Sequence, residues 1–448
     1  VSGYYQLLGE TYVYTYIANT LLVLTGVLVL TFVFGVGAAY LTSFYQFPGS
    51  TFFTWALILS FAVPSYIYAY SLTAFFGYFG NLYSFLTYLF GPSDYHTLIP
   101  KVDGLLGSIL SMSFSLFIYV YLITRASFIY QSQNLVDAGK IMGFSNYQTF
   151  KKIIFPSARP GIVVGLSLVA MESISDFGTV SFFNIQTLTT AIYDSWIIFD
   201  DIATAYQLSF FLIIIVLIFF WLERMSRSRS KFYMPTRGYE AINKIKLQGT
   251  SAAYATAFCL LLFTCSFLFP ISQILLWVIQ FPDNIHLAQL IELSVNTVSI
   301  VILTTLCLIV LAFFTNYGMR ISKSKFLNAV TNFSVSGYVI PGVILAVTLL
   351  SFLSFTSKLT NSNWIHFLFS GSIIGLVIAY CVRFYSLAIN GIKSGYEKLN
   401  TNLDDASYLL GYTKFGTFIK IHLPFLQPNL LLIAMLVAID ILKELPIT

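Results

Sequence analysis

Four acidic residues lie within apolar stretches of the chain, where an ionisable side chain is costly. Glu172 and Asp176 are four residues apart, so a helix would place both on one face. Asp440 and Glu444 repeat this spacing 268 positions later. Two equivalent pairs of carboxylates are the side chains in this sequence best suited to meeting a cation inside a membrane.

The four carboxylates have two possible roles. If two halves of the molecule pack about a pseudo-two-fold axis, the pairs could meet near its centre and form a path or gate for a cation. Alternatively, they lie at the outer ends of helices, or form structural ion pairs with Lys443 and Arg383. The spacing alone is compatible with both roles.

A polar, cationic segment precedes each carboxylate pair, at residues 137–160 and 405–428. The two copies share anchors at the constant offset of 268: Asp137 and Asp405, Gly143 and Gly411, Ile153 and Ile421, Pro156 and Pro424, Pro160 and Pro428. The pattern predicts two short helices joined at a glycine, which can adopt the positive φ of a sharp turn. The proline that follows suits the start of the next helix. One copy alone is compatible with an amphipathic surface loop, but two matched copies favour docking onto a partner.

The composition places these segments in a polytopic membrane protein. Hydrophobic residues make up 57% of the 448 residues and charged residues 9%, whereas a soluble domain carries about 25% charged residues. Since a span needs about 20 apolar residues, we predict ten spans. They are 19–41, 52–76, 105–124, 161–182, 205–222, 251–279, 294–315, 333–354, 370–390 and 428–446. Pro64 and Pro341 fall inside spans, where neighbouring helices can satisfy the freed backbone groups.

Basic residues set the orientation. If the segment beginning at Asp137 is cytoplasmic, 19 of the 23 Lys and Arg residues lie on the inside. The duplication extends to Asn19-Thr20 and Asn296-Thr297, so six spans separate the copies and both halves have the same orientation. The predicted organisation is a first repeat at 1–222, a basic cytoplasmic linker at 223–250 and a second repeat at 251–448. Matching the halves predicts one more span at each end of the full protein, twelve in all.

The duplicated segments resemble the EAA signature of ABC-importer permeases, which is an acidic residue, Ala, a small residue, and then Gly at a fixed distance. The matching residues are Asp137, Ala138, Gly139 and Gly143 in the first copy, and Asp405, Ala406, Ser407 and Gly411 in the second. Gly139, Phe155 and Ser407 depart from the usual pattern. The resemblance implies an all-α protein with two tandem, parallel repeats of the MetI-like permease fold. It also implies that both segments are coupling helices docked on a cytoplasmic ABC ATPase dimer.

Two further stretches resemble the ferric-iron type within that family. They are the Asp-Phe-Gly stretch in Ser173–Trp196 and the Lys-Glu-Leu-Pro stretch in Lys443–Thr448. The resemblance implies a bacterial inner-membrane permease that receives iron from a periplasmic or lipid-anchored binding protein. Iron(III) prefers oxygen ligands, which the intramembrane carboxylates would supply. Permeases for thiamine, phosphonate and polyamines share this architecture and stay open as alternatives.

The sequence lacks the motifs that would indicate several other functions. The chain has no G-x-x-x-x-G-K-[ST] phosphate loop, so we expect that it binds no cofactor and that ATP acts through the partner ATPase. The four cysteines and four histidines have no metal-ligand spacing, and we assign them no metal. The net charge of +5 reflects basic residues on the predicted inner side of the membrane, near anionic lipid. It does not indicate nucleic-acid binding. The rival functions are an ion-driven secondary carrier and a membrane scaffold that transports nothing.

Overall fold

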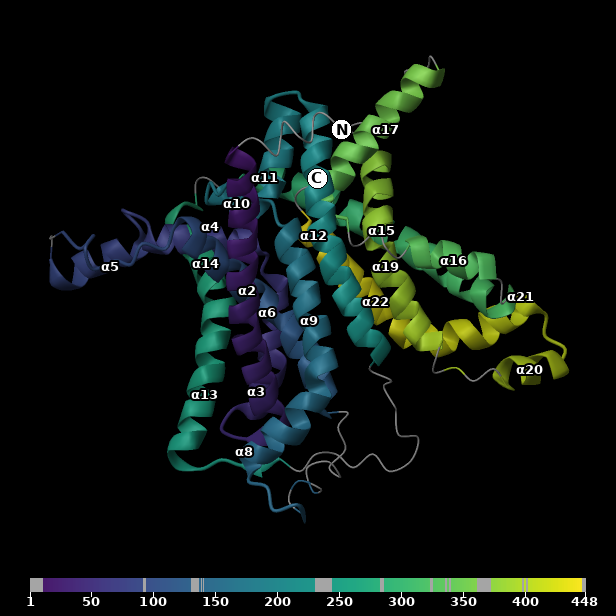
Figure 1. Ribbon diagram of the computed structural model, residues 1–448, viewed down its shortest axis with the longest axis horizontal. Helices are drawn as coiled ribbons and strands as arrows, with labels where there is room; N and C mark the ends of the chain where they lie inside the picture. The colour runs from purple at the N-terminus through teal and green to yellow at the C-terminus, as the bar shows by residue number, and fades with distance from the viewer. Residues whose placement is uncertain are drawn as a thin grey trace. The chain divides into compact units, whose positions relative to one another are not determined.

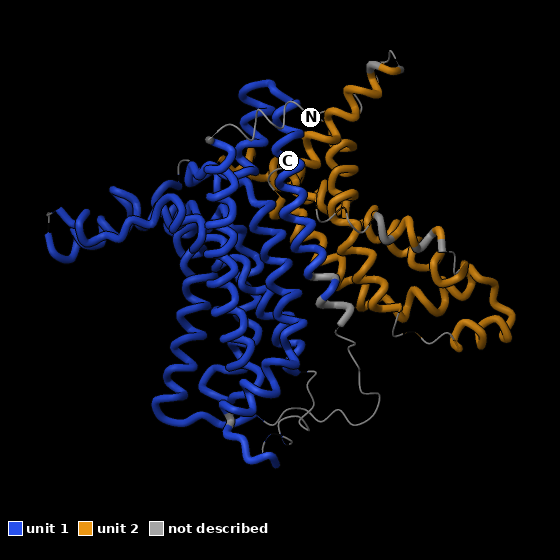
Figure 2. Tube along the Cα trace, in the orientation of Figure 1, with its two compact units in different colours: residues 1–282 blue, residues 283–448 orange. Residues whose placement is uncertain are grey.

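The computed structural model of the protein shows helices joined by short connections (Figure 1). It describes all residues except 1–10, 92–93, 130–136, 138, 140, 230–243, 283–285, 323–324, 335–336, 338–339, 361–371, 397–398, 400–401 and 445–448. The chain divides into two compact units, Val1–Pro282 and Asp283–Thr448 (Figure 2). Ala138 of the predicted first coupling segment therefore lies outside the described residues.

The first unit contains most of the helices. They are α2 (Thr11–Phe44), α3 (Ser50–Ala56), α4 (Ser65–Phe76), α5 (Asn81–Phe90), α6 (Gly104–Ile129), α8 (Asn146–Thr149), α9 (Phe155–Ser175), α10 (Gly178–Phe182), α11 (Leu188–Tyr193), α12 (Ile202–Arg229), α13 (Gly249–Phe263) and α14 (Phe269–Gln280). A 3-10 turn, η1 (Leu57–Ala62), follows α3, and π-helical turns η2 (Phe150–Ile154), η3 (Asp194–Ile198) and η4 (Thr264–Leu268) interrupt longer helices. Two short strands, β1 (Tyr45–Gln46) and β2 (Ile245–Lys246), pair in parallel.

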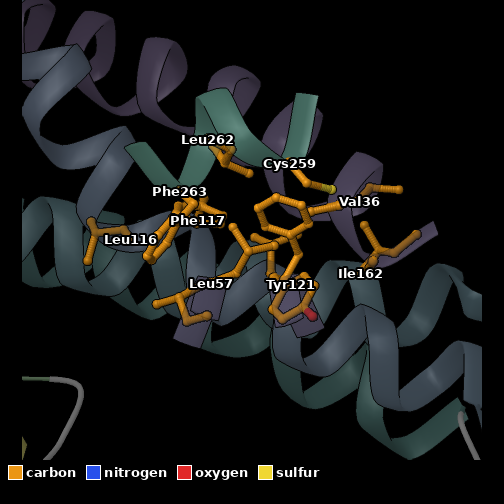
Figure 3. Packing of buried hydrophobic residues seen from close by; sticks show 14 of the residues in the cluster. Val36, Leu57, Leu116, Phe117, Tyr121, Ile162, Cys259, Leu262 and Phe263 are labelled. Carbon is orange, nitrogen blue, oxygen red and sulfur yellow. The ribbon is translucent and has the colours of Figure 1, made fainter. Parts of the chain in front are cut away.

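Helices α2, α6 and α9 form the centre of this unit, and α13 covers one side of it. Figure 3 shows Tyr121 and Phe117 of α6 packed among side chains from α2, η1, α9 and α13. Lipid is as apolar as these side chains, so close packing rather than removal from water holds membrane helices together. Gly35 illustrates the fit, because a Cβ on it would lie 2.6 Å from Cβ of Val120. Cys259 is fully buried in this core, where it packs as a small apolar side chain.

The predicted span 52–76 is not one straight helix. It breaks at Val63-Pro64, and the helical axes on either side differ by 93°. The carbonyl oxygen of Val63 accepts a hydrogen bond of 2.7 Å from the Ser115 hydroxyl on α6. A neighbouring helix thus satisfies the backbone at the proline, as the sequence predicts, but the proline breaks the helix instead of lying inside it.

The described residues contain eight helices that are long and apolar enough to cross a membrane, and nine if the bent pair is one span. A shorter apolar helix lies at Gly342–Ser357. These ten segments coincide with the ten predicted spans, and the helical, multi-span fold class is confirmed. The ends differ by several residues, since helices such as the 34-residue α2 continue beyond the apolar core.

The second unit repeats the order of the first. Its helices are α15 (Leu287–Ser322), α16 (Lys325–Ser334), α17 (Gly342–Thr360), α19 (Ile373–Tyr396), α20 (Asn402–Leu409), α21 (Lys414–Thr417) and α22 (Leu423–Lys443), with a π-helical turn η7 (Phe418–His422). Helices α15, α19 and α22 pack together as α2, α6 and α9 do. Every boundary of α21, η7 and α22 lies 268 residues after the corresponding boundary of α8, η2 and α9. The two copies of the duplicated sequence therefore fold into the same secondary structure, down to single helical turns.

The compact units do not divide where the sequence duplication was placed. The helices at 249–280 fall in the predicted second repeat, yet they pack on α2, α3 and α4 within the first unit. Strand pairing brings the end of the linker to the same unit, and the Lys244 ammonium donates a 2.7 Å hydrogen bond to the carbonyl oxygen of Thr42. The repeat boundaries at 1–222, 223–250 and 251–448 describe the predicted sequence duplication and differ from the boundary between the two compact units. They remain a prediction.

Candidate coupling segments and intramembrane charges

Both candidate coupling segments, residues 137–160 and 405–428, turn at their glycine. Gly143 has φ of 74° and Gly411 has φ of 83°, the left-handed conformation that the sequence predicts for both. The amide of Phe144 donates to the carbonyl of Gly139 at 3.0 Å, and that of Tyr412 donates to the carbonyl of Ser407 at 3.1 Å. These bonds close the end of each first helix in the same way.

The small residue before each turn allows the two short helices to approach closely. A Cβ on Gly139 would lie 2.6 Å from the Thr149 methyl group. At the equivalent place in the second segment, the Ser407 hydroxyl bonds the Thr417 hydroxyl at 2.6 Å. Gly139 and Ser407, which both depart from the EAA pattern, thus allow the same close contact between the two short helices, one by lacking a side chain and one by hydrogen bonding.

A cation lies over an aromatic ring at the same place in both segments. Lys152 Nζ lies 4.6 Å from the centre of the Phe144 ring, and Lys420 Nζ lies 4.8 Å from that of Tyr412. Such contacts contribute about 0.5–1 kcal/mol at exposed sites. The sequence-level prediction did not single these pairs out, although both obey the 268-residue offset.

Both segments expose large apolar side chains at the same three positions around the turn. In the first segment Ile141 is 86% exposed, and Met142 and Tyr147 are also exposed. In the second segment, the equivalent residues are Leu409, Leu410 and Phe415, and Leu409 is 89% exposed. A Cβ on either turn glycine would meet nothing within 4 Å, so the turns themselves are uncovered. Repeated apolar groups on an otherwise polar segment are typical of a surface that docks onto a partner.

The prolines lie at the start of the next membrane helix, as predicted. Pro156 is at the first turn of α9 and Pro424 at that of α22, directly after the π turns η2 and η7. A proline has no N–H, so the regular bonding pattern of an α-helix cannot run unbroken through either position. The rigid helix therefore follows a defined irregular turn in both segments.

Asp404, which lies just before the second segment, joins three helices. Its carboxylate accepts from Arg320 Nε of α15 at 2.7 Å and contacts His422 Nε2 of η7 at 2.9 Å. The Tyr396 hydroxyl lies 3.4 Å from His422 Nδ1, so a neutral imidazole with its proton on Nε2 fits both contacts. Burial disfavours ionised Asp404, but the hydrogen bonds from Arg320 and His422 outweigh it and lower the pKa of the carboxyl.

The Asp404 network belongs to the second repeat alone. The positions equivalent to Arg320, His422 and Tyr396 in the first repeat are Ser43, Ile154 and Phe128. Sequence reasoning assigned His422 no role, because Arg320 lies 84 residues before Asp404 and no short motif joins them. The signal that the sequence offered for this network was that the residue types at these positions differ between the two copies.

Of the four intramembrane carboxylates, Asp176 and Glu444 lie at helix ends. Asp176 ends α9, where it accepts from the Ser65 hydroxyl and from the backbone amide of Thr179 at 2.7 Å. Glu444 ends α22 and pairs with Arg383 Nε at 3.0 Å, with both side chains 6% exposed. Both contacts match the structural alternative that the sequence left open.

The same two carboxylates are connected to the proline breaks. Ser65, which binds Asp176, directly follows Pro64. Arg383, which binds Glu444, also donates to the carbonyl of Ile340, before Pro341, at 3.4 Å. Arg383 lies 268 residues after Ser115, the donor to the Val63 carbonyl, so equivalent positions cap both breaks.

Glu172 and Asp440 are half-buried within α9 and α22, one turn before these helix ends. Their role in a pathway stays a prediction. Within the described residues, no group of three or more His, Cys, Asp or Glu side chains is placed to hold a metal ion.

Comparison with known proteins connects this architecture to a family. Residues 31–231 match the family described as "Binding-protein-dependent transport system inner membrane component". The match covers α6, the first candidate coupling segment and α9. Residues 31–231 therefore carry the domain of this family of inner-membrane transport permeases. With its several membrane-spanning helices, the chain is a multi-pass protein of the inner membrane. The family domain implies that a substrate-binding protein and an ATPase work with it.

The permease resembles several curated transporters. It is 23% identical over 441 residues to the "Fe(3+)-transport system permease protein FbpB 2" of Haemophilus influenzae, with 96% of this chain and 80% of the relative aligned. It is 25% identical over 150 residues to the "Sulfate transport system permease protein CysT" of Salmonella typhimurium, covering 34% of this chain and 51% of that protein. A "Putative 2-aminoethylphosphonate transport system permease protein PhnU" of the same organism is 25% identical over 193 residues, covering 42% and 66%.

Proposed function

We propose that this permease is the membrane subunit of an ATP-driven importer for ferric iron. The observation that carries the proposal is the pair of coupling segments with matching turns, matching close contacts and matching exposed apolar residues. A cytoplasmic ATPase dimer would offer two equivalent clefts, one for each segment. The Haemophilus influenzae iron permease, which aligns over 96% of the chain, supports ferric iron as the cargo.

The proposed mechanism is alternating access. ATP binding would close the ATPase dimer and draw together the segments that contain Asp137, Gly143, Asp405 and Gly411. Because α9 and α22 continue from these segments through rigid proline-started turns, the movement would pass into the membrane. The permease would then open towards the extracytoplasmic binding protein that delivers the cargo. ATP would act only through the ATPase, with no cofactor held by this chain.

Docking is tested by capturing the ATPase with purified permease. Replacing the exposed apolar residues by Ile141→Glu and Leu409→Glu should weaken capture by at least about tenfold, because each cleft would then have to bury a charge. Leu98→Glu is the control. Leu98 is exposed at the other end of α6, so this substitution should leave capture unchanged.

Bulky residues at Gly143 and Gly411 should also abolish capture, because both glycines have positive φ. Unchanged capture by all these variants would contradict the proposal.

Uptake of radioactive ferric iron into proteoliposomes tests the cargo. The complete complex should transport iron only with ATP, and an ionophore that collapses ion gradients should not stop it. Uptake driven by a gradient without ATP would instead favour the secondary carrier. Preferred uptake of sulfate or 2-aminoethylphosphonate would replace the cargo but keep the ATP-driven mechanism.

Glu172 and Asp440 are the side chains we propose for the cation path, and Asp176 and Glu444 would hold the ends of their helices. The double variant Glu172→Gln and Asp440→Asn should reduce iron uptake while leaving ATPase capture intact. Wild-type uptake with wild-type coupling to ATP would remove both residues from the pathway.

A further inference from the structure

Helix α5 and its flanking residues form an apolar arm at the end of α6 opposite the first coupling segment. The arm comprises residues 77–91 and, as Figure 1 shows, projects sideways from the bundle of α2, α6 and α13. None of the residues in α5 is buried by the rest of the chain. Tyr88 is 86% exposed, and the other exposed large side chains of the arm are Tyr78, Phe79, Phe85, Leu89 and Phe90.

The composition of the arm fits lipid better than water. No Lys, Arg, Asp or Glu occurs anywhere between Thr11 and Pro92. The serine and threonine hydroxyls of α5 are satisfied by the local backbone, since Ser84 donates to the Gly80 carbonyl at 3.3 Å and Thr87 to the Tyr83 carbonyl at 2.9 Å. The helix thus presents few polar groups that need water.

The direction of the arm favours the membrane plane. Residues 65–90 run at 93° to the half-span 50–62, which packs alongside α6. With ten residues, α5 is about 15 Å long and too short to cross a bilayer. Tyrosine and tryptophan side chains are enriched where lipid headgroups meet the acyl chains, and the arm carries Tyr78, Tyr83 and Tyr88.

Two contacts hold the arm in this position. The Asn81 amide donates to Gln273 Oε1 at 2.8 Å, and Gln273 is buried in the membrane-spanning helix α14. Near the same part of the arm, the His96 ring stacks on Tyr78 with ring centres 3.6 Å apart, and on Tyr83 at 4.7 Å. The arm is therefore fixed at its base and uncovered along its outer part.

We propose that α5 is an interfacial anchor that lies in the headgroup region of the bilayer and takes lipid as its partner. An uncharged helix in the membrane plane, joined directly to a membrane-embedded helix, is covered most simply by the lipid that already covers its neighbours. The proposal does not depend on the cargo or on the ATPase, so its failure would leave the proposed transport function untouched.

The test places a nitroxide label at Tyr88→Cys in lipid nanodiscs, with the four native cysteines replaced by Ala. Power saturation compares collision with oxygen, which concentrates in lipid, and with a water-soluble nickel chelate. Val29→Cys, exposed on α2 within the span, supplies the lipid reference, and Ser145→Cys, at the first coupling segment, supplies the aqueous reference. We expect the Tyr88 label to be shielded from the chelate, with an accessibility ratio nearer to that of Val29 than to that of Ser145.

A Tyr88 label as accessible to the chelate as the Ser145 label would overturn the proposal. A label that is accessible alone but shielded after the binding protein is added would also overturn it, and would assign the arm to protein docking. Phe85→Cys on the same helix repeats the measurement if the Tyr88 variant fails to fold, as judged by gel filtration.

Discussion

Asp404 distinguishes the two coupling segments at the level of single residues. Its carboxylate connects the end of α15, the start of the second segment and the π turn before α22. The first repeat has Ile154 where the second has His422, and Ser43 where it has Arg320. The second segment is thus attached to its membrane helices by charge-assisted hydrogen bonds, which are stronger than neutral ones.

Removing this charge should destabilise the permease, with a definite pH dependence. Asp404→Asn should cost about 1–3 kcal/mol at neutral pH, because Arg320 is only 13% exposed and would lose its ionised partner. The pKa of Asp404 is lowered by folding, so its contribution is present above the unfolded pKa of about 3.9 and is lost as the pH falls through the folded value. The stabilities of wild type and variant, measured by thermal unfolding, should therefore differ by a constant amount between about pH 6 and 8. This difference should begin to shrink near pH 4, close to the unfolded pKa, and should disappear only as the pH falls through the lower folded pKa.

Asp405→Asn is the matched control, since the neighbouring carboxylate is exposed and should change stability little. A difference between wild type and Asp404→Asn that persists unchanged in acid would show that the ionised pair is not its source.

Thr149 offers a second prediction at the residue scale. Its hydroxyl is buried without a hydrogen-bond partner, whereas the equivalent Thr417 bonds Ser407. Gly139→Ser would copy the second segment into the first and supply that partner, for a gain of about 1 kcal/mol once Thr149 rotates to admit the new Cβ. Gly139→Leu should instead destabilise the segment, because its larger side chain cannot fit beside Thr149. Thermal unfolding of the two variants tests this, and equal melting temperatures would contradict it.

The sequence predicted these segments more fully than it predicted their surroundings. The glycine turns, the small residue and the proline starts follow from residue type and spacing alone. The Asp404 network and the carbonyl caps from Ser115 and Arg383 join positions 43–84 residues apart, so only the packed helices reveal them. The ends of α9 and α22 show the same limit, because the sequence could not choose between a pathway and a structural role for Asp176 and Glu444.

At the scale of helices, apolar run length located the eight long helices, the bent pair and the shorter helix at Gly342–Ser357, but it could not describe their shape. The break at Pro64 and the π turns cannot be seen in the apolar pattern, because apolar residues occur both before and after each of them. The packing of helices at 249–280 on the first unit was also hidden from the sequence, because chain order does not determine which neighbour a helix chooses.

The crossing of α6 with α9 in the first repeat and the equivalent crossing of α19 with α22 in the second have their glycine on opposite helices. In the first repeat, Gly161 of α9 lies against Ser127 of α6. In the second, the equivalent pair is Asn429 of α22 and Gly395 of α19, where a Cβ on the glycine would lie 2.5 Å from the Asn429 amide nitrogen. The small residue has moved to the opposite helix while the close approach is retained, as expected for packing that depends on backbone proximity.

This exchange predicts compensation between two substitutions. Gly395→Ser alone should destabilise the second unit by about 1–3 kcal/mol through overpacking, and Asn429→Gly alone should lose the 2.9 Å hydrogen bond to the Gly391 carbonyl. The double variant recreates the Ser127–Gly161 pair and should be more stable than the sum of the single effects. A double-mutant cycle in thermal unfolding measures this coupling, and strict additivity would refute it.

For the whole molecule, orientation decides whether the two coupling segments can serve one partner. Basic residues place both segments on the inside, and the even number of spans between the repeats gives the two segments the same side. Helix α6 joins the outer loop to the first segment, so Lys101 and Ser145 must lie on opposite sides of the membrane.

Labelling of intact cells with a membrane-impermeant maleimide tests this arrangement. Lys101→Cys should react in intact cells, while Ser145→Cys should react only after the membrane is opened, because both residues are exposed at opposite ends of α6. The wild-type chain, whose Cys259 is buried in the core, controls for labelling of native thiols. The reverse pattern would place 19 of the 23 basic residues outside and put both segments beyond the reach of a cytoplasmic ATPase at once, since neither can change sides without the other.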